Sequence, residues 1–148
     1  MPTFLDTRAS ESQISCVTER YALLLIDHGS RRAEANELLE KVAEMVRSRV
    51  DADRIVEVAH MELAKPTIEG GFAQCVEEGA TMVVVHPFML APGRHVTEDL
   101  PRLIAAAAAS HPGTKYVIAE PLGTHPGIAQ AVIDRCASAL AEDPREQS

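Results

Sequence analysis

The sequence predicts a single α/β domain, with a four-stranded parallel sheet and helices on both of its faces, in the order βαβαβαβα. Four short apolar runs alternate with four longer segments in which apolar residues recur at helical spacing. Because crossovers between parallel strands are right-handed, this alternation brings all four strand carboxyl ends to one edge. The length of 148 residues suits one domain, expected over 20–141 between polar tails of 1–19 and 142–148.

The individual elements follow from the same pattern. Strands are expected over 21–26, 55–61, 81–85 and 116–119, and helices over 33–50, 66–78, from about 99 or 101 to 110, and over 126–140. The first and third runs are almost continuously apolar, which is typical of parallel strands buried on both faces. Gly79 suits the end of the second helix, and Thr97 or Asp99 is expected to cap the third.

Composition and charge exclude several classes of protein. The formal net charge of -8 argues against nucleic-acid binding, because proteins that hold phosphates present a basic face. No apolar run approaches the roughly 20 residues of a membrane span, and the first twenty residues lack the apolar stretch of a secretory signal. The three cysteines are widely separated, which favours reduced thiols. A cytoplasmic protein without nucleic-acid or membrane partners is expected.

Polar side chains gather at the carboxyl ends of the expected strands. His28 follows the first strand, Glu62 follows the second, and His86 ends the third with His95 soon after it. Imidazole and carboxylate donors without thiolates suit a divalent ion such as iron, cobalt, nickel or zinc. Cations that could hold an acidic ligand follow the same strands: Arg31, Arg32, Lys65, Arg94 and Arg102. This edge therefore predicts a metal-handling site.

Four segments of the sequence carry a resemblance to a known family. They read DHGSRR at 27–32, HMELAKPTI at 60–68, PFMLAPGRHVTEDLP at 87–101 and LGTHP at 122–126. These segments resemble the signature blocks of the small sirohydrochlorin chelatases, and the resemblance extends over residues 21–140. The variants Asp27 and His60-Met61 look closer to the iron-inserting branch of that family than to its cobalt branch.

The resemblance implies a chelatase-like half domain that works as a homodimer. It implies insertion of Fe²⁺, or alternatively Co²⁺, into sirohydrochlorin without ATP or a prosthetic group. By resemblance, His28, Glu62 and His95 are the metal-handling and catalytic residues. An open site with two imidazoles and one carboxylate would hold the ion loosely enough to release it, and a histidine that titrates near neutral pH can accept the pyrrole protons. The expected contacts to the polycarboxylate substrate are Arg31, Arg94 and His86.

Structural roles are alternatives for each of these residues. His28 could be a buried, hydrogen-bonded histidine, and Glu62 a solvated surface carboxylate. His86 could orient a ligand or belong to the core. Arg94 could pair with an acidic residue four or five positions further along the chain. His125 could line the pocket or cap the last helix.

Two other functions fit part of the pattern. A non-catalytic carrier of metal or tetrapyrrole would keep the same ligands. A histidine-based phosphoryl-transfer enzyme could use a strand-end histidine as nucleophile, with Arg31, Arg32 and Arg94 on the phosphate. That alternative lacks an arginine directly before His28 and a G-x-x-x-x-G-K-[ST] loop.

Overall fold

The computed structural model describes residues 19–146, and within this range the order of elements is the predicted βαβαβαβα. The elements are β1 (Tyr21–Asp27), α1 (Ala33–Arg47), β2 (Ile55–His60), α2 (Ile68–Glu77), β3 (Met82–Pro87), α3 (Arg94–Ala109), β4 (Lys115–Ile118), α4 (Pro126–Ala141) and a short 3-10 helix (Pro144–Glu146). Residues 1–18 of the expected tail of 1–19 and residues 147–148 of the expected tail of 142–148 lie outside the described residues, and the short 3-10 helix falls within the second of these tails. None of the helices described is long and apolar enough to cross a membrane.

The sheet has the strand order β2-β1-β3-β4, and every neighbouring pair is parallel. Asp27 is the register partner of His60, and Ile26 is the partner of Pro87, so β1, β2 and β3 end nearly level. The chain moves outward from β1 to β2 and in the opposite direction from β3 to β4. The loops after the neighbouring strands β1 and β3 therefore run in opposite directions. Such a place is a topological switch point, which is where ligands bind in open α/β sheets.

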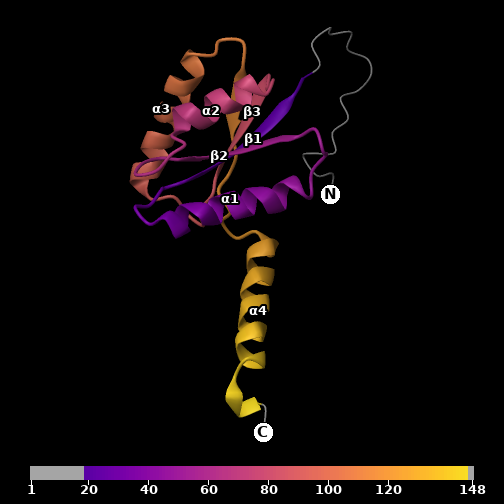
Figure 1. Ribbon diagram of the computed structural model, residues 1–148. Helices are drawn as coiled ribbons and strands as arrows, with labels where there is room; N and C mark the ends of the chain where they lie inside the picture. Colours follow the sequence, from indigo (N-terminus) through magenta and orange to yellow (C-terminus); the bar gives the residue numbers. More distant parts are fainter. Residues whose placement is uncertain (1–18, 147–148) are drawn as a thin grey trace.

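The core has one layer on each face of the sheet. On one face, α2 and α3 cover the strands, and Phe72 and Ile104 are fully buried against Leu24. On the other face, α1 lies across β1 and β2, and Leu39 packs with Leu25. Figure 1 shows α1 on one side of the sheet and α2 and α3 on the other. Burial of each such side chain contributes roughly 1.5–3 kcal/mol to stability.

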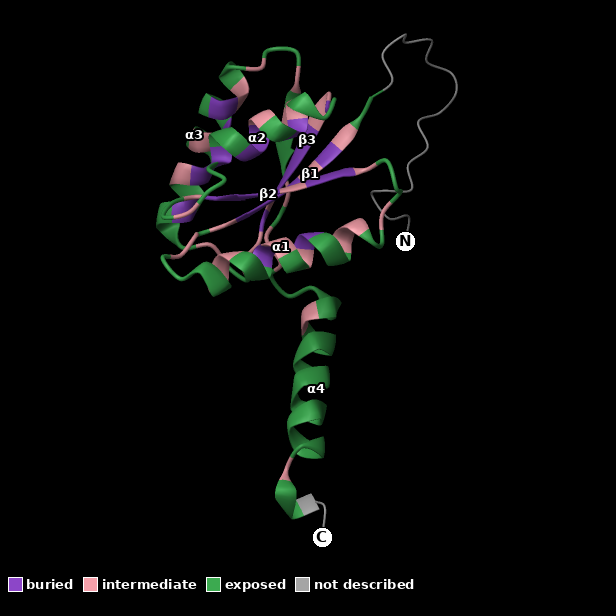
Figure 2. Ribbon diagram, in the orientation of Figure 1, coloured by how far each residue is buried: buried purple, intermediate pink, exposed green. Residues whose placement is uncertain are grey.

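The last helix, α4, departs from the sheet. It has no buried residue, and its large apolar side chains Val132, Ile133 and Leu140 are 57%, 60% and 64% exposed. Figures 1 and 2 show α4 extending away from the body of the molecule, exposed almost along its whole length. Among residues 19–146, none covers over β4 the sheet face that α1 covers over β1 and β2, and Val117 is 45% exposed there. Helices do lie on both faces of the sheet, as predicted, but α4 is not one of them.

The third helix begins earlier than the sequence predicts. It begins at Arg94, and Gly93 occupies the N-cap position without a side-chain cap. The backbone N–H and the hydroxyl of Thr97 both donate to the Gly93 carbonyl at 3.1 Å, so helical hydrogen bonding already includes Thr97. The expectation that Thr97 or Asp99 caps this helix is therefore wrong. Pro101, a residue type common in first turns, lies inside the helix instead.

Candidate functional site

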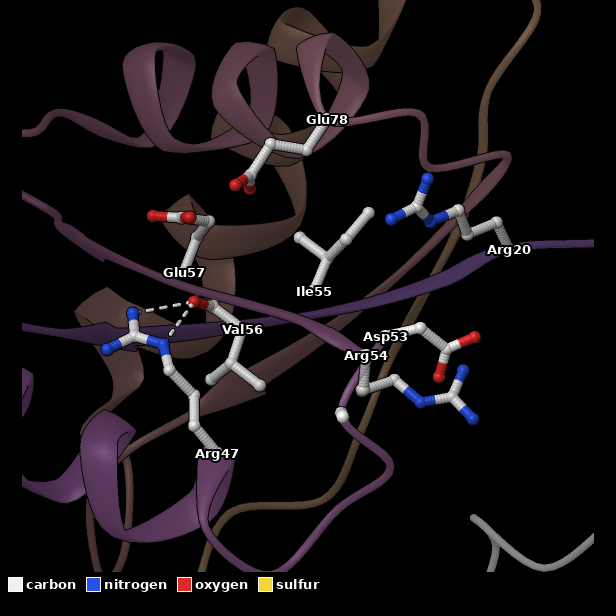
Figure 3. Close-up of a pocket in the computed structure, with 9 residues that line it drawn as sticks. Arg20, Arg47, Asp53, Arg54, Ile55, Val56, Glu57 and Glu78 are labelled. Carbon is white, nitrogen blue, oxygen red and sulfur yellow. Dashed lines mark hydrogen bonds between the residues drawn. The ribbon is translucent and has the colours of Figure 1, made fainter.

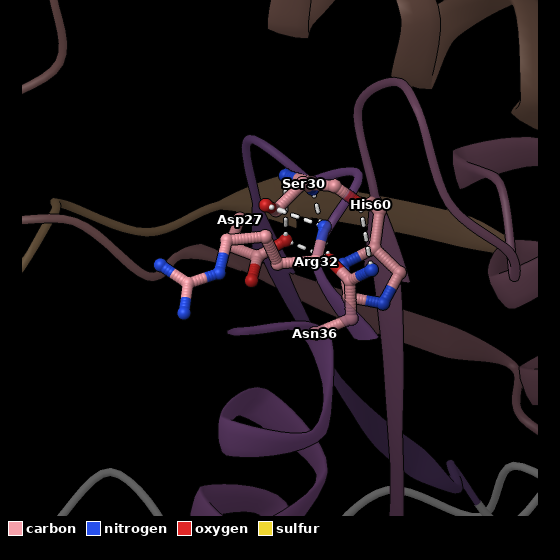
Figure 4. A network of polar contacts seen from close by, with 6 residues as sticks. Asp27, Ser30, Arg32, Asn36 and His60 are labelled. Carbon is pink, nitrogen blue, oxygen red and sulfur yellow. Dashed lines mark hydrogen bonds and ion pairs between the residues drawn. The ribbon is translucent and has the colours of Figure 1, made fainter. Parts of the chain in front are cut away.

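The loop after β1 presents His28, and local hydrogen bonds fix the shape of that loop. His28 is exposed rather than buried. The Asp27 carboxylate accepts a hydrogen bond from the Gly29 N–H at 3.0 Å. The Asn36 side chain makes two hydrogen bonds to the Ser30 backbone: it accepts from the N–H at 2.9 Å and donates to the carbonyl at 2.8 Å. Figure 4 shows this network, which ties the loop to the first turn of α1.

The loop after β2 presents Glu62 directly beside the His28 loop. The Glu62 N–H donates to the His28 carbonyl at 3.1 Å, and the Met61 N–H donates to the Asp27 carbonyl at 3.0 Å. Gly29 has a φ of 83°, and a Cβ atom on it would collide with the Glu62 carbonyl oxygen. Only glycine allows this approach of the two loops. The structure thus makes His28 and Glu62 neighbours, with both side chains exposed.

His95 lies in the first turn of α3, close to the end of β3. Its side chain is 75% exposed, and its Nδ1 lies 2.9 Å from Oδ2 of Asp99. A carboxylate that accepts from Nδ1–H leaves the Nε2 lone pair as the donor toward a metal ion, and such pairing is usual for metal-ligating histidines. Asp99 also accepts from Arg102 at 3.1 Å, which holds the carboxylate in place.

His86 stands at the end of β3 and is half-buried. Burial lowers the pKa of its imidazole below the usual range, although a hydrogen bond to the Glu120 backbone raises it. The ring meets the edge of Phe88 at a centroid distance of 6.4 Å. His86 is therefore neutral near pH 7, which suits a wall of the site better than a charged contact to a carboxylate.

The cations expected to hold substrate are at the surface. Arg94 has a 90% exposed side chain and donates to Glu98 at 3.0 Å, the surface pairing that the sequence left as an alternative. Such exposed pairs contribute little to stability, so the guanidinium can exchange partners at low cost. Arg31 is exposed in the loop after His28.

The remaining histidines have structural roles. His60 is 2% exposed, and its Nδ1 lies 2.5 Å from Oδ1 of Asp27. His125 is the N-cap of α4, accepting from the Gly127 N–H at 2.9 Å, so its capping role is confirmed. His111 packs on Phe72 with ring centroids 5.8 Å apart.

The sequence did not predict the contact between Asp27 and His60, nor the two hydrogen bonds between the Asn36 side chain and the Ser30 backbone. The two members of the first contact lie 33 positions apart. Only the register of β1 and β2 brings them together. An aspartate at a strand end directly before the candidate His28 was the one signal in the sequence that could have pointed to it.

The structure brings the loops of His28 and Glu62 into contact, with the loop before His95 on the far side of β1. Within residues 19–146, no three His, Cys, Asp or Glu side chains already form a group able to hold a metal ion. Convergence of His28, Glu62 and His95 on one ion stays a prediction. The cysteines contribute no thiolate cluster, since Cys75 and Cys136 are separate free thiols and Cys16 lies outside the described residues.

A polar pocket lies away from this edge, beside the amino-terminal half of β2. Its volume is about 380 Å³, and Figure 3 shows Glu57 and Glu78 directed toward each other at one side of it. Arg47 crosses beside Glu57 and donates to the Val56 carbonyl at 2.7 and 3.1 Å. This pocket shares no residue with the candidate site.

Fold and site together define a class of protein: a parallel α/β half domain whose carboxyl edge offers imidazole, carboxylate and guanidinium groups on neighbouring loops. The CbiX family model matches residues 22–139. The chain belongs to the CbiX family, and the family resemblance predicted from the sequence is confirmed.

Individual relatives agree with this assignment. The chloroplastic sirohydrochlorin ferrochelatase of Arabidopsis thaliana is 45% identical, over 80% of this chain and 52% of that protein. The sirohydrochlorin cobaltochelatase of Methanopyrus kandleri is 34% identical, over 82% of this chain and 99% of that protein. The chain thus spans about half the length of the first relative and nearly all of the second.

Solved structures agree as well. The sirohydrochlorin chelatase SirB from Bacillus subtilis subspecies spizizenii, in complex with cobalt, has a TM-score of 0.72 and 34% identity, over 80% of this chain and 50% of that one. The CbiX protein from Marinobacter aquaeolei has a TM-score of 0.71 and 31% identity, over 83% of this chain and 99% of that one. Both comparisons confirm the predicted fold.

Proposed function

We propose that this protein is a sirohydrochlorin chelatase that inserts a divalent metal ion, Fe²⁺ or alternatively Co²⁺, into sirohydrochlorin without ATP. The observation that carries the proposal is the hydrogen-bonded contact between the His28 and Glu62 loops, at the edge where a carboxylate-oriented His95 follows the neighbouring strand. The names of the ferrochelatase and cobaltochelatase relatives support the substrate and the reaction.

The proposed chemistry has two parts: the site holds the metal ion, and it accepts the protons that the tetrapyrrole loses. His28, Glu62 and His95 receive the ion, which is a substrate here, and hold it with few ligands so that the macrocycle can take it over. Insertion of one divalent ion replaces two pyrrole N–H protons, so two protons must leave. The imidazole of His28 or His95 is the proposed acceptor: once it has released the ion, it takes one proton at a time and passes each proton to solvent before the next.

The substrate is a polycarboxylate and the protein is acidic, so local cations must hold it. Arg31 and Arg94 are the proposed contacts because both are exposed beside the metal-handling residues. His86 forms part of the wall. The iron preference rests on the 45% identity to the Arabidopsis ferrochelatase, and Fe²⁺ and Co²⁺ favour nearly the same donors.

Anaerobic incubation of the purified protein with sirohydrochlorin and either ion tests the proposal. Metal insertion changes the absorbance spectrum of the tetrapyrrole, and the rate should exceed that of the protein-free reaction with at least one ion. A protein that binds tetrapyrrole or metal but leaves the rate unchanged is a carrier, and that result would refute the enzymatic proposal. The proposed cytoplasmic location is tested by cell fractionation.

We also propose that the protein works as a homodimer. In the described part of one chain, the apolar side chains of α4 and of the sheet face over β4 are exposed, with Ile133 and Val117 among them. Relatives twice as long as this chain match it over half of their length, which is the arrangement expected if two such units form one enzyme. Light scattering should therefore give about twice the 16.0 kDa of one chain. A monomer that inserts metal at full rate would contradict this.

A further inference from the structure

A polar contact between a buried histidine and a partly exposed aspartate lies directly beneath the proposed metal-handling loops. His60 is 2% exposed and its Nδ1 lies 2.5 Å from the Asp27 carboxylate, although neither side chain belongs to the proposed ligand set. The two residues are register partners at the last paired position of β1 and β2. Figure 4 shows the histidine ring and the carboxylate facing each other across the two strands. An ionised carboxylate only accepts hydrogen bonds, so the Nδ1 of His60 carries the hydrogen.

Each member of this pair is also attached to one of the loops. The same oxygen of Asp27 accepts from the Gly29 N–H at 3.0 Å, and the Asp27 carbonyl accepts from the Met61 N–H at 3.0 Å. The His60 N–H donates to the Pro66 carbonyl at 2.8 Å, which closes the loop that carries Glu62. The contact thus joins the base of the His28 loop to the base of the Glu62 loop.

Stability alone does not explain a polar pair at this position. Taking the His60 imidazole and most of the Asp27 carboxylate out of water requires desolvation, even though the Asp27 side chain stays 21% exposed, and well-packed apolar residues of similar volume often stabilise as well or better. A directional contact, however, sets the distance and orientation of the two strand ends in a way that apolar packing does not. The contact fixes that geometry one residue before His28 and two residues before Glu62.

We propose that Asp27 and His60 are positioning residues, which hold His28 and Glu62 at the spacing needed to receive the metal ion. This inference rests on the proposed function, because it assumes that the ion binds between these loops. Partners that orient metal ligands typically change metal affinity by about 10- to 100-fold when they are removed. A pair that acts through the backbone of the loops should fall near the lower end of that range.

Two pairs of variants separate positioning from simple burial. Asp27→Asn keeps an oxygen that accepts from Gly29 and His60, whereas Asp27→Ala removes it. His60→Asn places its amide N–H near the position of Nδ1, whereas His60→Leu keeps volume but removes the donor. His60→Gln, whose amide reaches the Nε2 position instead, replaces the leucine variant if that variant does not fold. Thr114→Val removes a hydrogen bond to the Ala80 carbonyl at the opposite end of the sheet and is the matched control.

The measurement is binding of Co²⁺ to the full-length protein without tetrapyrrole, followed by visible absorption of the bound ion. His28→Ala identifies the signal that belongs to the site. Asp27→Ala and His60→Leu should weaken this binding by about 10-fold. Asp27→Asn, His60→Asn and Thr114→Val should stay within about threefold of the wild type. Exchange of the Glu62 amide hydrogen should become faster only in the first two variants.

Three results would overturn the proposal. If all variants bind Co²⁺ as the wild type does, positioning is wrong although the proposed function stands. If the conservative variants lose binding as completely as Asp27→Ala, the hydrogen-bond geometry is not what matters. If the wild type shows no Co²⁺ binding that His28→Ala removes, the proposed function and the positioning role fail together.

Discussion

The first and last helices are nearly equal in length but differ in how the protein uses them. α1 has 15 residues and buries Leu39 and Ala43 against the sheet, whereas α4 has 16 residues and buries none. The loops at the carboxyl edge do not differ in this way, because backbone hydrogen bonds join the loops after β1 and β2 and also those after β3 and β4, where the Leu122 N–H donates to the Met89 carbonyl at 3.0 Å. On the side of α4, however, the side chains of His95 and Arg94 at the start of α3 are 75% and 90% exposed. The part built from β1, α1 and β2, called the closed part below, buries its apolar side chains within one chain. The part formed by β4, α4 and the start of α3, called the open part below, leaves apolar side chains and candidate site residues exposed.

Removal of the metal-handling histidines is expected to have the largest effect. His28→Ala belongs to the closed part and His95→Ala to the open part, and each should reduce catalysed insertion by about 10²- to 10⁴-fold, because a proton acceptor and metal ligand is lost. Both side chains are exposed, so the melting temperature should change little. Initial rates and thermal unfolding measure the two quantities. Wild-type turnover in both variants would refute the mechanism.

A charge on α4 tests whether the open part is completed by a second chain. Ile133→Asp should convert the proposed dimer to a monomer, because an apolar side chain that is 60% exposed in one chain would be buried in the dimer. Light scattering against protein concentration measures this change. Ser138→Asp adds the same charge on the other side of the helix and should leave the dimer intact. Equal behaviour of the two variants would exclude this face of α4 as the contact.

Substitution of Arg94 tests whether the open part of the molecule contacts the substrate. Arg94→Ala should raise the KM for sirohydrochlorin roughly tenfold with little change in kcat, since a hydrogen bond to a substrate carboxylate contributes in the ground and transition states alike. Steady-state kinetics with varied tetrapyrrole measures both constants. Arg94→Lys keeps the charge and should show a smaller increase. A fall in kcat at constant KM would place Arg94 in the chemical step instead.

The smallest effect is expected in the closed part, away from the site. Burial and a hydrogen bond with Glu78 raise the pKa of Glu57 to about 7. The folded protein therefore holds a proton that the unfolded chain releases, and the free energy of unfolding should fall as pH rises from about 4.5 to 7. Solvent screening limits this loss to less than about 1 kcal/mol. Urea unfolding across this range should show a flatter profile for Glu57→Gln, whereas the exposed Glu44→Gln should match the wild type.

The sequence predicts the closed part well and the open part less well. Apolar periodicity locates all four strands and four helices because it reports burial within one chain, and the strand ends then locate His28 and Glu62. It reports nothing about which surface a helix covers, so the position of α4 was not predictable. The start of α3 was missed because Gly93 provides no side-chain cap. The Asp27–His60 contact depends on strand register, which the local pattern does not contain.

The outer edge of β2 has a consequence for self-association. A strand at the border of a sheet can recruit a strand from another molecule unless its backbone groups are blocked. Here the Arg47 guanidinium donates twice to the Val56 carbonyl, which occupies an acceptor that an added strand would need. At the other border, β4 is only four residues long. Both borders thus discourage further chains from extending the sheet sideways into open-ended aggregates, so the proposed dimer would have to form through another surface, such as the exposed face of α4.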